Sequence, residues 1–342
     1  MTSKTFSVAC AGAGYFAQFH HAAWQQVTGA RLVAVADRNP AATIPEGVGR
    51  HTDLASLLDG CRIDILDIAT PPETHVSMIE QAIAAGVTRI ICQKPFCGDL
   101  SAARRMAGQA AEAGVDLIVH DNFRFQPWYR QLKEIIDEGA LGRIHQISFA
   151  LRPGDGRGPD AYLDRQPYFQ TMERFLVHET AVHLLDIFAF LLGLPDQIYA
   201  DLRRLNPNIA GEDAGLIILG YEDGRRAIFD GNRLIDHAAE NRRLTMGEAL
   251  VEADAACVRL DGYGRLHRRE TGKTDWRLIW SCAPDGRFGG GCVEALCQHA
   301  VDAWRQGGTP ENHAAEYLEI LALEEQVYES AATGSRLSRK SD

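Results

Sequence analysis

A regular alternation of strand-like and helix-like segments over residues 1–122 constrains this chain more than any other feature. Short runs typical of buried strands occur at 6–11, 31–36, 63–68, 89–92 and 117–120. Segments with helical periodicity lie at 15–27, 74–85 and 101–113, and the last two end at Gly86 and Gly114. Because strands joined by helices run parallel, this rhythm predicts an α/β fold with a doubly wound parallel sheet.

The first strand-to-helix turn has the sequence GAGYFA, in which Gly12, Gly14 and Ala17 have the spacing of a dinucleotide-binding turn. Gly12 permits the tight turn, Gly14 lets a pyrophosphate approach the backbone, and Ala17 lets the helix pack closely on the sheet. Asp37 ends the second strand, where a carboxylate accepts hydrogen bonds from the ribose and repels a 2′-phosphate. The turn therefore predicts NAD, while Arg38 leaves NADP open; the alternative is an ordinary glycine turn in a flavodoxin-like domain.

Three polar loops follow predicted strands: ATPPETH (69–75), QKPF (93–96) and HDNFRF (120–125). The carboxyl ends of parallel strands meet at one edge of a sheet, where open α/β sheets bind their ligands. His75 is either a ligand contact or a solvated histidine at a helix start, and Lys94 is either functional or an ordinary surface lysine. The following proline favours an extended backbone at Lys94, which aims its side chain.

The pattern changes after about residue 127. We expect a helix at 128–138, a strand at 144–151, a long loop at 152–174 and a helix that contains 178–183. Further strands are expected at 197–205, 214–221, 225–231 and within 243–269, and helices at 292–305 and 313–332. This predicts a Rossmann domain at 1–122 and an α+β domain at 123–342 with a large, mostly antiparallel open sheet.

The stretch HETAVH at 178–183 looks like a zinc-protease motif with one residue too many. Zinc-binding histidines on a helix stand four residues apart on one face. On a regular helix of 3.6 residues per turn, His178 and His183 point about 140° apart and cannot share a metal. Glu179, His183 and Asp186 are spaced four and three apart, so they share a face. We therefore expect no metal, and either a catalytic histidine beside a carboxylate or a half-buried histidine with a hydrogen-bonded partner.

Charge and composition narrow the classes of function. Acidic residues outnumber basic ones 46 to 35, and no cluster of Lys or Arg offers a surface for nucleic acid or a membrane. The longest apolar run, HLLDIFAFLLGL, is too short to span a membrane and contains Asp186. The eight cysteines lack CxxC spacing, which is typical of reduced thiols, and we expect a cytoplasmic protein.

Taken together, these motifs resemble the Gfo/Idh/MocA oxidoreductases, the family of glucose–fructose oxidoreductase and inositol dehydrogenase. The shared features are the glycine turn, Asp37-Arg38, TPPETH, QKP in place of the usual EKP, NFRF, LGRI, and the pattern formed by Glu179, His183 and Asp186. The departures are Gln93 in place of Glu, and Glu179 where the family often has Asp. The resemblance implies the two-domain fold and a catalytic role for Lys94 and His183, with Glu179 beside the histidine.

Candidate cofactor contacts lie in the glycine turn and in the loops after the first-domain strands: Gly12, Gly14, Tyr15, Phe16, Asp37, Arg38, Thr70, Pro71, Pro72, His75, Gln93, Lys94 and Asn122. Candidate substrate contacts are Arg124, Arg152, Tyr162, Tyr168, His178 and His183. The 152–174 loop mixes arginines, aspartates and tyrosines that suit a polyhydroxylated ligand. The alternative is a solvated, partly disordered loop.

We therefore predict an NAD-dependent oxidoreductase that acts on a secondary alcohol or ketone of a sugar, polyol or sugar derivative. Lys94 would bind the reacting oxygen and His183 would take its proton. The alternatives are a non-catalytic NAD-binding sensor on the same scaffold and an enzyme for a non-sugar substrate such as a dihydrodiol or an amine. The segment GLIILGY (215–221) is apolar at both alternating sets of positions, so we also expect a homodimer or homotetramer formed through the C-terminal sheet.

Overall fold

The structure, a computed structural model, describes residues 5–282 and 286–340 and divides the chain into two units. The first unit comprises residues 1–122 and 293–319, and the second comprises residues 123–292 and 320–342. The sequence suggested two continuous domains instead, at 1–122 and 123–342. The segment 293–319 therefore departs from that expectation, because it returns to the first unit.

Tertiary contacts explain why this late segment belongs to the first unit. Gln298, on helix α7 (Cys292–Arg305), bonds to both the backbone N–H and the carbonyl of Thr28. Asn312 donates to the backbone carbonyl of Asp121, and the Tyr317 hydroxyl donates to the Asp121 carboxylate at 2.8 Å. Such pairings between residues far apart in sequence leave no local pattern from which they could be predicted.

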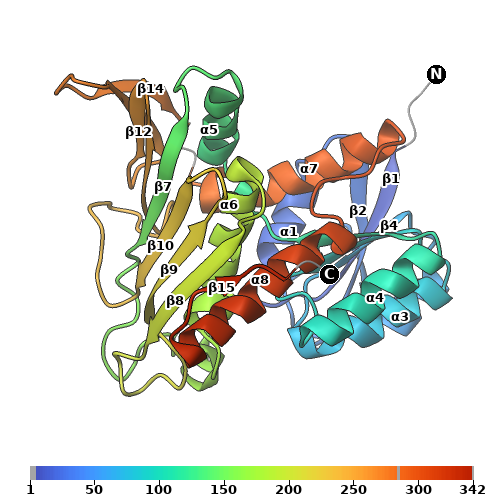
Figure 1. Ribbon diagram of the computed structural model, residues 1–342. Helices are drawn as coiled ribbons and strands as arrows, with labels where there is room; N and C mark the ends of the chain where they lie inside the picture. Colours follow the sequence, from blue (N-terminus) through green and yellow to red (C-terminus); the bar gives the residue numbers. More distant parts are fainter. Residues whose placement is uncertain (1–4, 283–285, 341–342) are drawn as a thin grey trace. The chain divides into compact units, whose positions relative to one another are not determined.

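Six parallel strands form the sheet of the first unit, in the order β3-β2-β1-β4-β5-β6 (Figure 1). The strands are β1 (Phe6–Ala11), β2 (Ala30–Ala36), β3 (Gly49–His51), β4 (Ile65–Ile68), β5 (Arg89–Gln93) and β6 (Asp116–His120). The helices between them are α1 (Ala17–Trp24), α2 (Leu54–Gly60), α3 (His75–Ala84) and α4 (Leu100–Glu112). The strand order reverses between β1 and β4, so the predicted doubly wound sheet is confirmed.

Two short elements of the first unit were not predicted. Strand β3 has three residues, and Gly49 and Arg50 are exposed, so it shows no apolar run. Helix α2 has seven residues and begins at Asp53, whose side chain accepts a hydrogen bond from the Ser56 N–H at 2.8 Å. This is a standard N-cap, but two buried leucines are too few to reveal a helical period.

Nine strands form the sheet of the second unit, in the order β14-β13-β12-β11-β7-β10-β9-β8-β15. All neighbours are antiparallel except β7 and β10, so the predicted mostly antiparallel sheet is confirmed. The strands are β7 (Ile144–Leu151), β8 (Gln197–Arg203), β9 (Ala214–Gly220), β10 (Arg226–Asn232), β11 (Gly247–Ala253), β12 (Ala256–Leu260), β13 (Arg265–Glu270), β14 (Arg277–Ser281) and β15 (Leu337–Ser338). The sequence did not predict the edge strands β14 and β15, because β14 is largely exposed and β15 has two residues.

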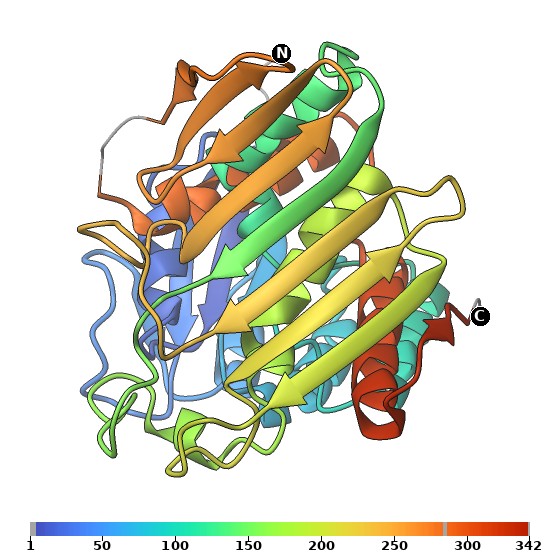
Figure 2. The same cartoon turned by 60° about the vertical axis from the view of Figure 1, so that its left-hand side comes forward.

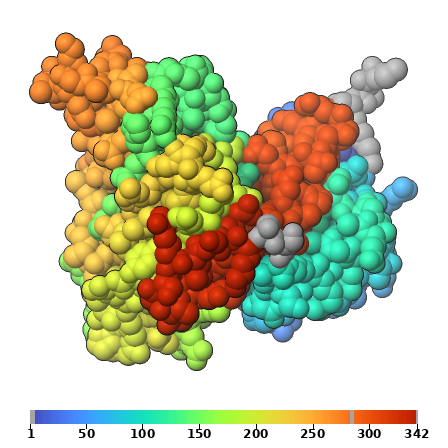
Figure 3. All heavy atoms as spheres, viewed as in Figure 1, coloured from blue at the N-terminus to red at the C-terminus, as the bar shows by residue number. Residues whose placement is uncertain are grey.

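The two faces of this second sheet differ. Helices α5 (Pro127–Asp137) and α6 (Val182–Leu192) lie behind it in Figure 2, which looks onto the open face. Along β9, Ile217 and Leu219 are buried toward the helices, whereas Leu216 on the open face is 36% exposed. Helix α5 packs beside β13 at one end of the sheet (Figures 1 and 3).

Candidate active site

The glycine turn of the first unit has the geometry that a dinucleotide needs. Gly12 has φ +110°, and a Cβ there would lie 2.5 Å from the Ala69 carbonyl oxygen, so only glycine fits. A Cβ at Gly14 would meet nothing within 4 Å, which leaves that backbone open to a ligand. The exposed Tyr15 follows it, with Phe16 half-buried beside it. These features fit the pyrophosphate of NAD.

Asp37 connects the end of β2 to this turn. One carboxylate oxygen accepts the Ala13 N–H at 2.7 Å and the other accepts the Asn39 N–H at 2.8 Å. Each oxygen keeps a second lone pair, so the carboxylate can still accept a hydrogen bond from a ribose hydroxyl. Asp37 is half-buried and Arg38 is exposed, which places the negative charge closer to the turn than the positive one.

The 69–75 loop is folded around a histidine. His75 is fully buried, and its Nε2 lies 2.9 Å from the Thr70 carbonyl oxygen. Burial lowers the pKa of His75, so the ring is neutral at neutral pH. His75 is therefore not a solvated surface residue; it holds the loop that contains Pro71 and Pro72 at the sheet edge.

Asn122, after β6, carries a further sign of a ligand contact. Its side chain is 2% exposed, and its amide nitrogen has no hydrogen-bond partner among the described residues. A buried amide without a partner costs about 1–3 kcal/mol, and such groups occur where a ligand supplies the missing bond. This supports Asn122 as a cofactor contact.

Lys94 follows β5 and is half-buried, with Gln93 beside it inside the first unit. The Gln93 side-chain oxygen accepts the backbone N–H of Lys94 at 2.7 Å, and the Gln93 amide nitrogen lies 2.9 Å from Nε2 of His20. Gln93 is 8% exposed. The residue that departs from the EKP pattern is thus a buried neighbour of Lys94.

The HETAVH stretch differs from the regular helix that its spacing suggested. Residues Leu176–Ala181 form a π-helical turn, and the α-helix α6 begins only at Val182. A π turn accommodates one more residue per turn than an α-helix, so neither the 140° separation nor the shared face of Glu179 and His183 follows from the sequence. The expectation based on 3.6 residues per turn was wrong for this segment.

Buried side chains from elsewhere in the second unit hold the π turn. One carboxylate oxygen of Glu212 accepts the N–H groups of Phe175 and Val177, each at 3.1 Å, and the hydroxyl of Tyr328 at 2.7 Å. Nδ1 of His178 lies 2.6 Å from the carboxylate of Glu324, which is 4% exposed on its side chain. The turn is therefore imposed by tertiary contacts, and π turns are frequent at functional sites.

His183 is buried and fixed by a stacking contact. Its ring lies 3.9 Å from the ring of Phe123, at an interplanar angle of 8°. The neighbouring Arg124 donates from Nε to Asp186 at 2.8 Å and makes a second contact through Nη2. The NFRF segment thus orients α6, and Arg124 has an ion-pair role that differs from the predicted substrate contact.

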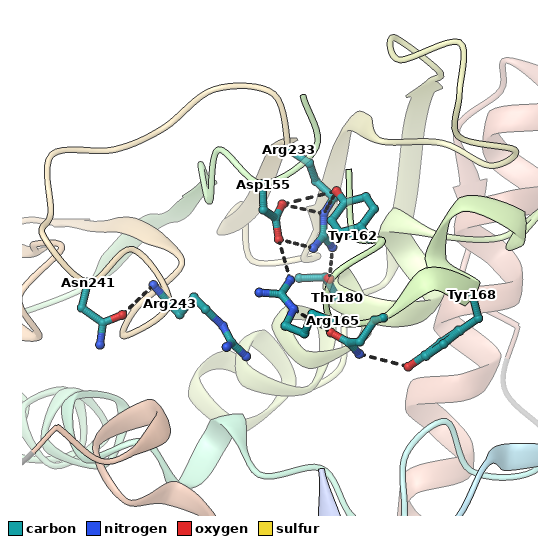
Figure 4. A network of polar contacts seen from close by, with 9 residues as sticks. Asp155, Tyr162, Arg165, Tyr168, Thr180, Arg233, Asn241 and Arg243 are labelled. Atoms are coloured by element: carbon teal, nitrogen blue, oxygen red, sulfur yellow. Dashed lines mark hydrogen bonds and ion pairs between the residues drawn. The ribbon is translucent and has the colours of Figure 1, made fainter. Parts of the chain in front are cut away.

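The 152–174 loop is held by a network that the sequence did not reveal (Figure 4). Its centre is Arg233, whose side chain is 2% exposed and lies just after β10. Arg233 donates through Nε and Nη2 to both oxygens of Asp155, through Nε to the Tyr162 hydroxyl, and through Nη1 to the Thr180 hydroxyl at 2.8 Å. One guanidinium therefore connects the loop to the π turn.

Two predicted substrate contacts have structural partners in the fold. Tyr162 is 3% exposed and packs with Phe169 and Phe175 in a small core inside the loop. Arg152 pairs with the carboxylate and backbone carbonyl of Asp230 at 2.6 Å. A contact of either side chain with substrate stays a prediction.

Tyr168, a further predicted substrate contact, is exposed on the same loop. Its side chain is 54% exposed, and its hydroxyl accepts a hydrogen bond from Gln166 at 3.0 Å. Burial of its hydroxyl, followed by the nearby charge of Glu179, raises the pKa of Tyr168 to about 12. Tyr168 therefore offers a neutral hydroxyl and an aromatic ring near Glu179.

Within residues 5–282 and 286–340, no three His, Cys, Asp or Glu side chains gather in a way that could hold a metal ion. Over the same residues, no helix combines the length and apolarity that crossing a membrane requires.

The comparisons with known proteins agree with this geometry. Residues 6–121 match the model of the oxidoreductase family with an NAD-binding Rossmann fold, and residues 129–248 match the GFO/IDH/MocA C-terminal domain. The chain is 35% identical to a D-apiose dehydrogenase of Paraburkholderia graminis, over 99% of this chain and 91% of that protein. It is 33% identical to a D-apiose dehydrogenase of Rhizobium rhizogenes, over 94% of each.

A solved structure gives the same result. An oxidoreductase from Agrobacterium radiobacter, in complex with NAD+, L-tartaric acid and magnesium, superimposes with a TM-score of 0.86 at 30% identity and covers 98% of both chains. The predicted resemblance and the predicted cofactor are therefore confirmed. The chain belongs to the Gfo/Idh/MocA family and is an NAD-dependent oxidoreductase.

Proposed function

We propose that this protein oxidises a small uncharged sugar, of the kind that D-apiose represents, at a hydroxyl-bearing carbon. Two relatives named D-apiose dehydrogenase align with nearly the whole chain, which supports a sugar or polyol as the substrate class. The observation that carries the choice of an uncharged substrate is the charge balance around the 152–174 loop.

That balance can be counted in the second unit. Arg233 and Arg165 share the carboxylate of Asp155, at 2.9 and 3.3 Å. Glu179 adds a second negative charge that acts on Arg233. The charges of Arg233 and Arg165 are thus accompanied by those of Asp155 and Glu179, which supports a substrate without a carboxylate of its own. Neutral hydroxyl groups fit these donors and acceptors without a charge penalty.

The proposed chemistry uses Lys94 and His183 at the reacting oxygen of the substrate. Lys94 Nζ would donate a hydrogen bond to the substrate hydroxyl oxygen and stabilise the negative charge that develops on it. His183, whose ring is fixed against Phe123, would accept the hydroxyl proton. NAD, when bound, supplies the acceptor for the hydride that leaves the same carbon. The C–H and O–H bonds break, a C=O bond forms, and NADH and one proton are released.

Self-association and location are further parts of the proposal. Tyr199, Ile218 and Ile228 are cross-strand neighbours and form a half-buried apolar row on the open face of the second sheet. A second copy could cover this row, which supports a homodimer or homotetramer. We place the protein in the cytoplasm, on the basis of its composition.

NADH formation with a panel of substrates tests the activity. D-apiose, myo-inositol and L-tartrate would be compared at equal concentration, and we expect an uncharged sugar to give the highest kcat/KM. A clear preference for L-tartrate would contradict the charge argument. No turnover with any alcohol, together with tight NAD binding, would favour the non-catalytic sensor.

Substitutions test the two proposed catalytic residues. Lys94→Ala and His183→Ala should each lower kcat on the order of 10²-fold or more, the range for general bases and oxyanion donors. The matched controls are Lys133→Ala and His145→Ala, which alter side chains in surface ion pairs. NAD affinity, measured by calorimetry, should stay close to that of the parent. Folded variants that turn over at the parent rate would refute the assignment.

A further inference from the structure

A chain of hydrogen bonds inside the first unit leads from helix α1 to Lys94. Trp24 Nε1 donates to Asp67 Oδ2 at 2.6 Å, and His20 Nδ1 lies 2.8 Å from the same oxygen. His20 Nε2 lies 2.9 Å from the Gln93 amide nitrogen, and the Gln93 oxygen accepts the Lys94 N–H at 2.7 Å. His20 and Asp67 are fully buried, and Gln93 is nearly so. Gln93, the residue at which the sequence departs from the EKP pattern, takes part in two of these contacts.

The backbone N–H of Lys94 determines which atom donates in the hydrogen bonds of Gln93 and His20. The Lys94 N–H can only donate, so the Gln93 oxygen must face it and the Gln93 NH2 must face His20. An NH2 group can only donate, so Nε2 of His20 must accept. The imidazole is therefore neutral, with its proton on Nδ1, from which it donates to Asp67.

Asp67 is suited to accept this proton. Burial by itself raises the pKa of the Asp67 carboxyl, but the interactions with His20 and the hydrogen bond from Trp24 hold it below its usual range. The carboxylate then receives two hydrogen bonds on one oxygen. A carboxylate at this end requires a proton on Nδ1 of His20, while the Gln93 NH2 requires that Nε2 carries none.

We propose that Gln93 is a positioning residue for Lys94: its amide holds His20 in the neutral Nδ1–H form and so fixes the backbone of Lys94 without a further ionisable group at position 93. The catalytic consequence rests on the proposed role of Lys94. A glutamate at position 93 would turn an oxygen toward Nε2 of His20, and two acceptors at about 2.9 Å require a shared proton between them. Glutamine avoids that extra proton.

Other ionisable groups lie near His20 and Asp67. The ring of His120, on β6, lies 4.2 Å from that of His20, and burial lowers the pKa of His120 to about 3. The remaining groups are His21, Asp37, Cys10 and Cys297. Burial raises the pKa of both thiols and lowers that of His21, so they stay neutral at neutral pH. Asp67 is thus the principal charge in contact with His20.

Long-range 1H–15N correlation on protein labelled at histidine tests the tautomer directly. The His20 signal would be identified by its loss in His20→Gln. We expect a ring that carries its proton on Nδ1 and none on Nε2, as the hydrogen bonds of Gln93 require. An imidazolium or an Nε2–H ring would overturn the proposal. This readout does not depend on substrate or on turnover.

The pH dependence of the melting temperature of Gln93→Glu provides a second test, which does not require the NMR signal of His20. The added proton is held between Glu and His20 only in the folded state, so its folded pKa lies above the usual histidine value of about 6.5. The stability that it contributes is complete below that value and is lost as pH rises through the folded pKa. The melting temperature of Gln93→Glu should therefore fall, relative to the parent, between about pH 6 and 9.

Gln81→Glu is the matched control, because it makes the same charge change on the exposed face of α3. Its melting temperature should follow that of the parent at each pH. If Gln93→Glu follows this control over the whole range, no proton is shared with His20 and the proposal is wrong.

Kinetics test the positioning itself. Gln93→Leu removes both hydrogen bonds and should lower kcat about 10-fold or more, since small displacements of a catalytic group are costly, while NAD affinity changes less than about 2-fold. The kcat of Gln93→Glu should be close to that of the parent near pH 6 and should fall as pH rises. A merely structural role of Gln93 would not produce this pH dependence. Parent-like kcat in Gln93→Leu would refute the positioning role. An active Lys94→Ala variant would refute the proposed catalytic role of Lys94. The NMR experiment would then still test the tautomer of His20.

Discussion

Removal of the Asp155 charge is the sharpest test of how the second unit is built. Asp155→Asn leaves Arg233 buried with an amide in place of its only carboxylate contact among the described residues. The amide introduced at position 155 would turn its NH2 toward the guanidinium of Arg233. One of the two hydrogen bonds to position 155 would then become a contact between two donors. The hydrogen bonds from Arg233 to Tyr162 and Thr180 remain.

The expected cost follows from burial. Removing one partner of a buried ion pair costs roughly 3–5 kcal/mol. The Asp155 side chain is 22% exposed and Arg233 keeps two neutral partners, so we expect the lower end, about 3 kcal/mol. For a unit of this size, 1 kcal/mol shifts the melting temperature by about 2–4 °C, which gives a fall of about 6–12 °C.

Calorimetric unfolding measures this fall, with Asp160→Asn as the control in an exposed part of the same loop. Arg233→Met combined with Asp155→Asn removes both charges, and we expect it to lose less than the sum of the two single variants. A melting temperature of Asp155→Asn equal to that of the control would refute the reasoning. A loss of stability in the double variant equal to the sum of the two single losses would also refute it.

The same pair gives a pH dependence of known sign. Although burial alone raises the pKa of Asp155, the charges of Arg233 and Arg165 hold it below the ordinary value. A lowered carboxyl pKa contributes stability that is complete above the unfolded value of about 3.9 and is lost as pH falls through the folded value. The parent should therefore lose more stability than Asp155→Asn in this acidic range. Equal losses in the two proteins would show that Asp155 does not titrate with folding.

Three further outcomes are expected. Asp37 should make NAD bind more tightly than NADP in calorimetric titration, because its carboxylate at the turn repels a 2′-phosphate, and equal affinities would contradict this. Prolonged chelation should leave turnover unchanged, and one equivalent of zinc whose removal abolishes activity would overturn the metal-free mechanism. Ile218→Arg, on the apolar row of the open sheet face, should shift light-scattering mass toward the monomer. Glu248→Arg, an exposed position on the same sheet, is its control, and a parent that is already monomeric would count against self-association.

Local patterns were sufficient to predict five of the six strands of the first sheet. Strand β4 and most of β1 and β5 are fully buried, so their sequences are apolar runs, and the helices between them carry a 3.6-residue period. The glycine turn could be recognised from the spacing of Gly12, Gly14 and Ala17 directly after the first strand. Such features depend on neighbours in sequence or on burial alone.

The candidate site could be predicted only in part, because the contacts of its side chains depend on partners that the sequence pattern does not reveal. Arg124, Arg152 and Tyr162 have the side chains of ligand contacts, but Asp186, Asp230 and Asp155 occupy them within the fold. Their partners lie between 7 and 78 residues away, and the polar composition of a loop does not reveal which charges pair. Composition therefore suggested a substrate wall where part of it is internal structure.

The sequence by itself determined the fold class, the NAD-binding turn and the family, because these depend on periodicity and on residues that must be glycine. Only the tertiary structure decided the π turn at Leu176–Ala181, since Glu212 and Tyr328 impose it from distant segments. It also returned 293–319 to the first unit. The protons around Gln93 likewise depend on His20, 73 residues away, because a hydrogen bond is set by distance in space and not along the chain.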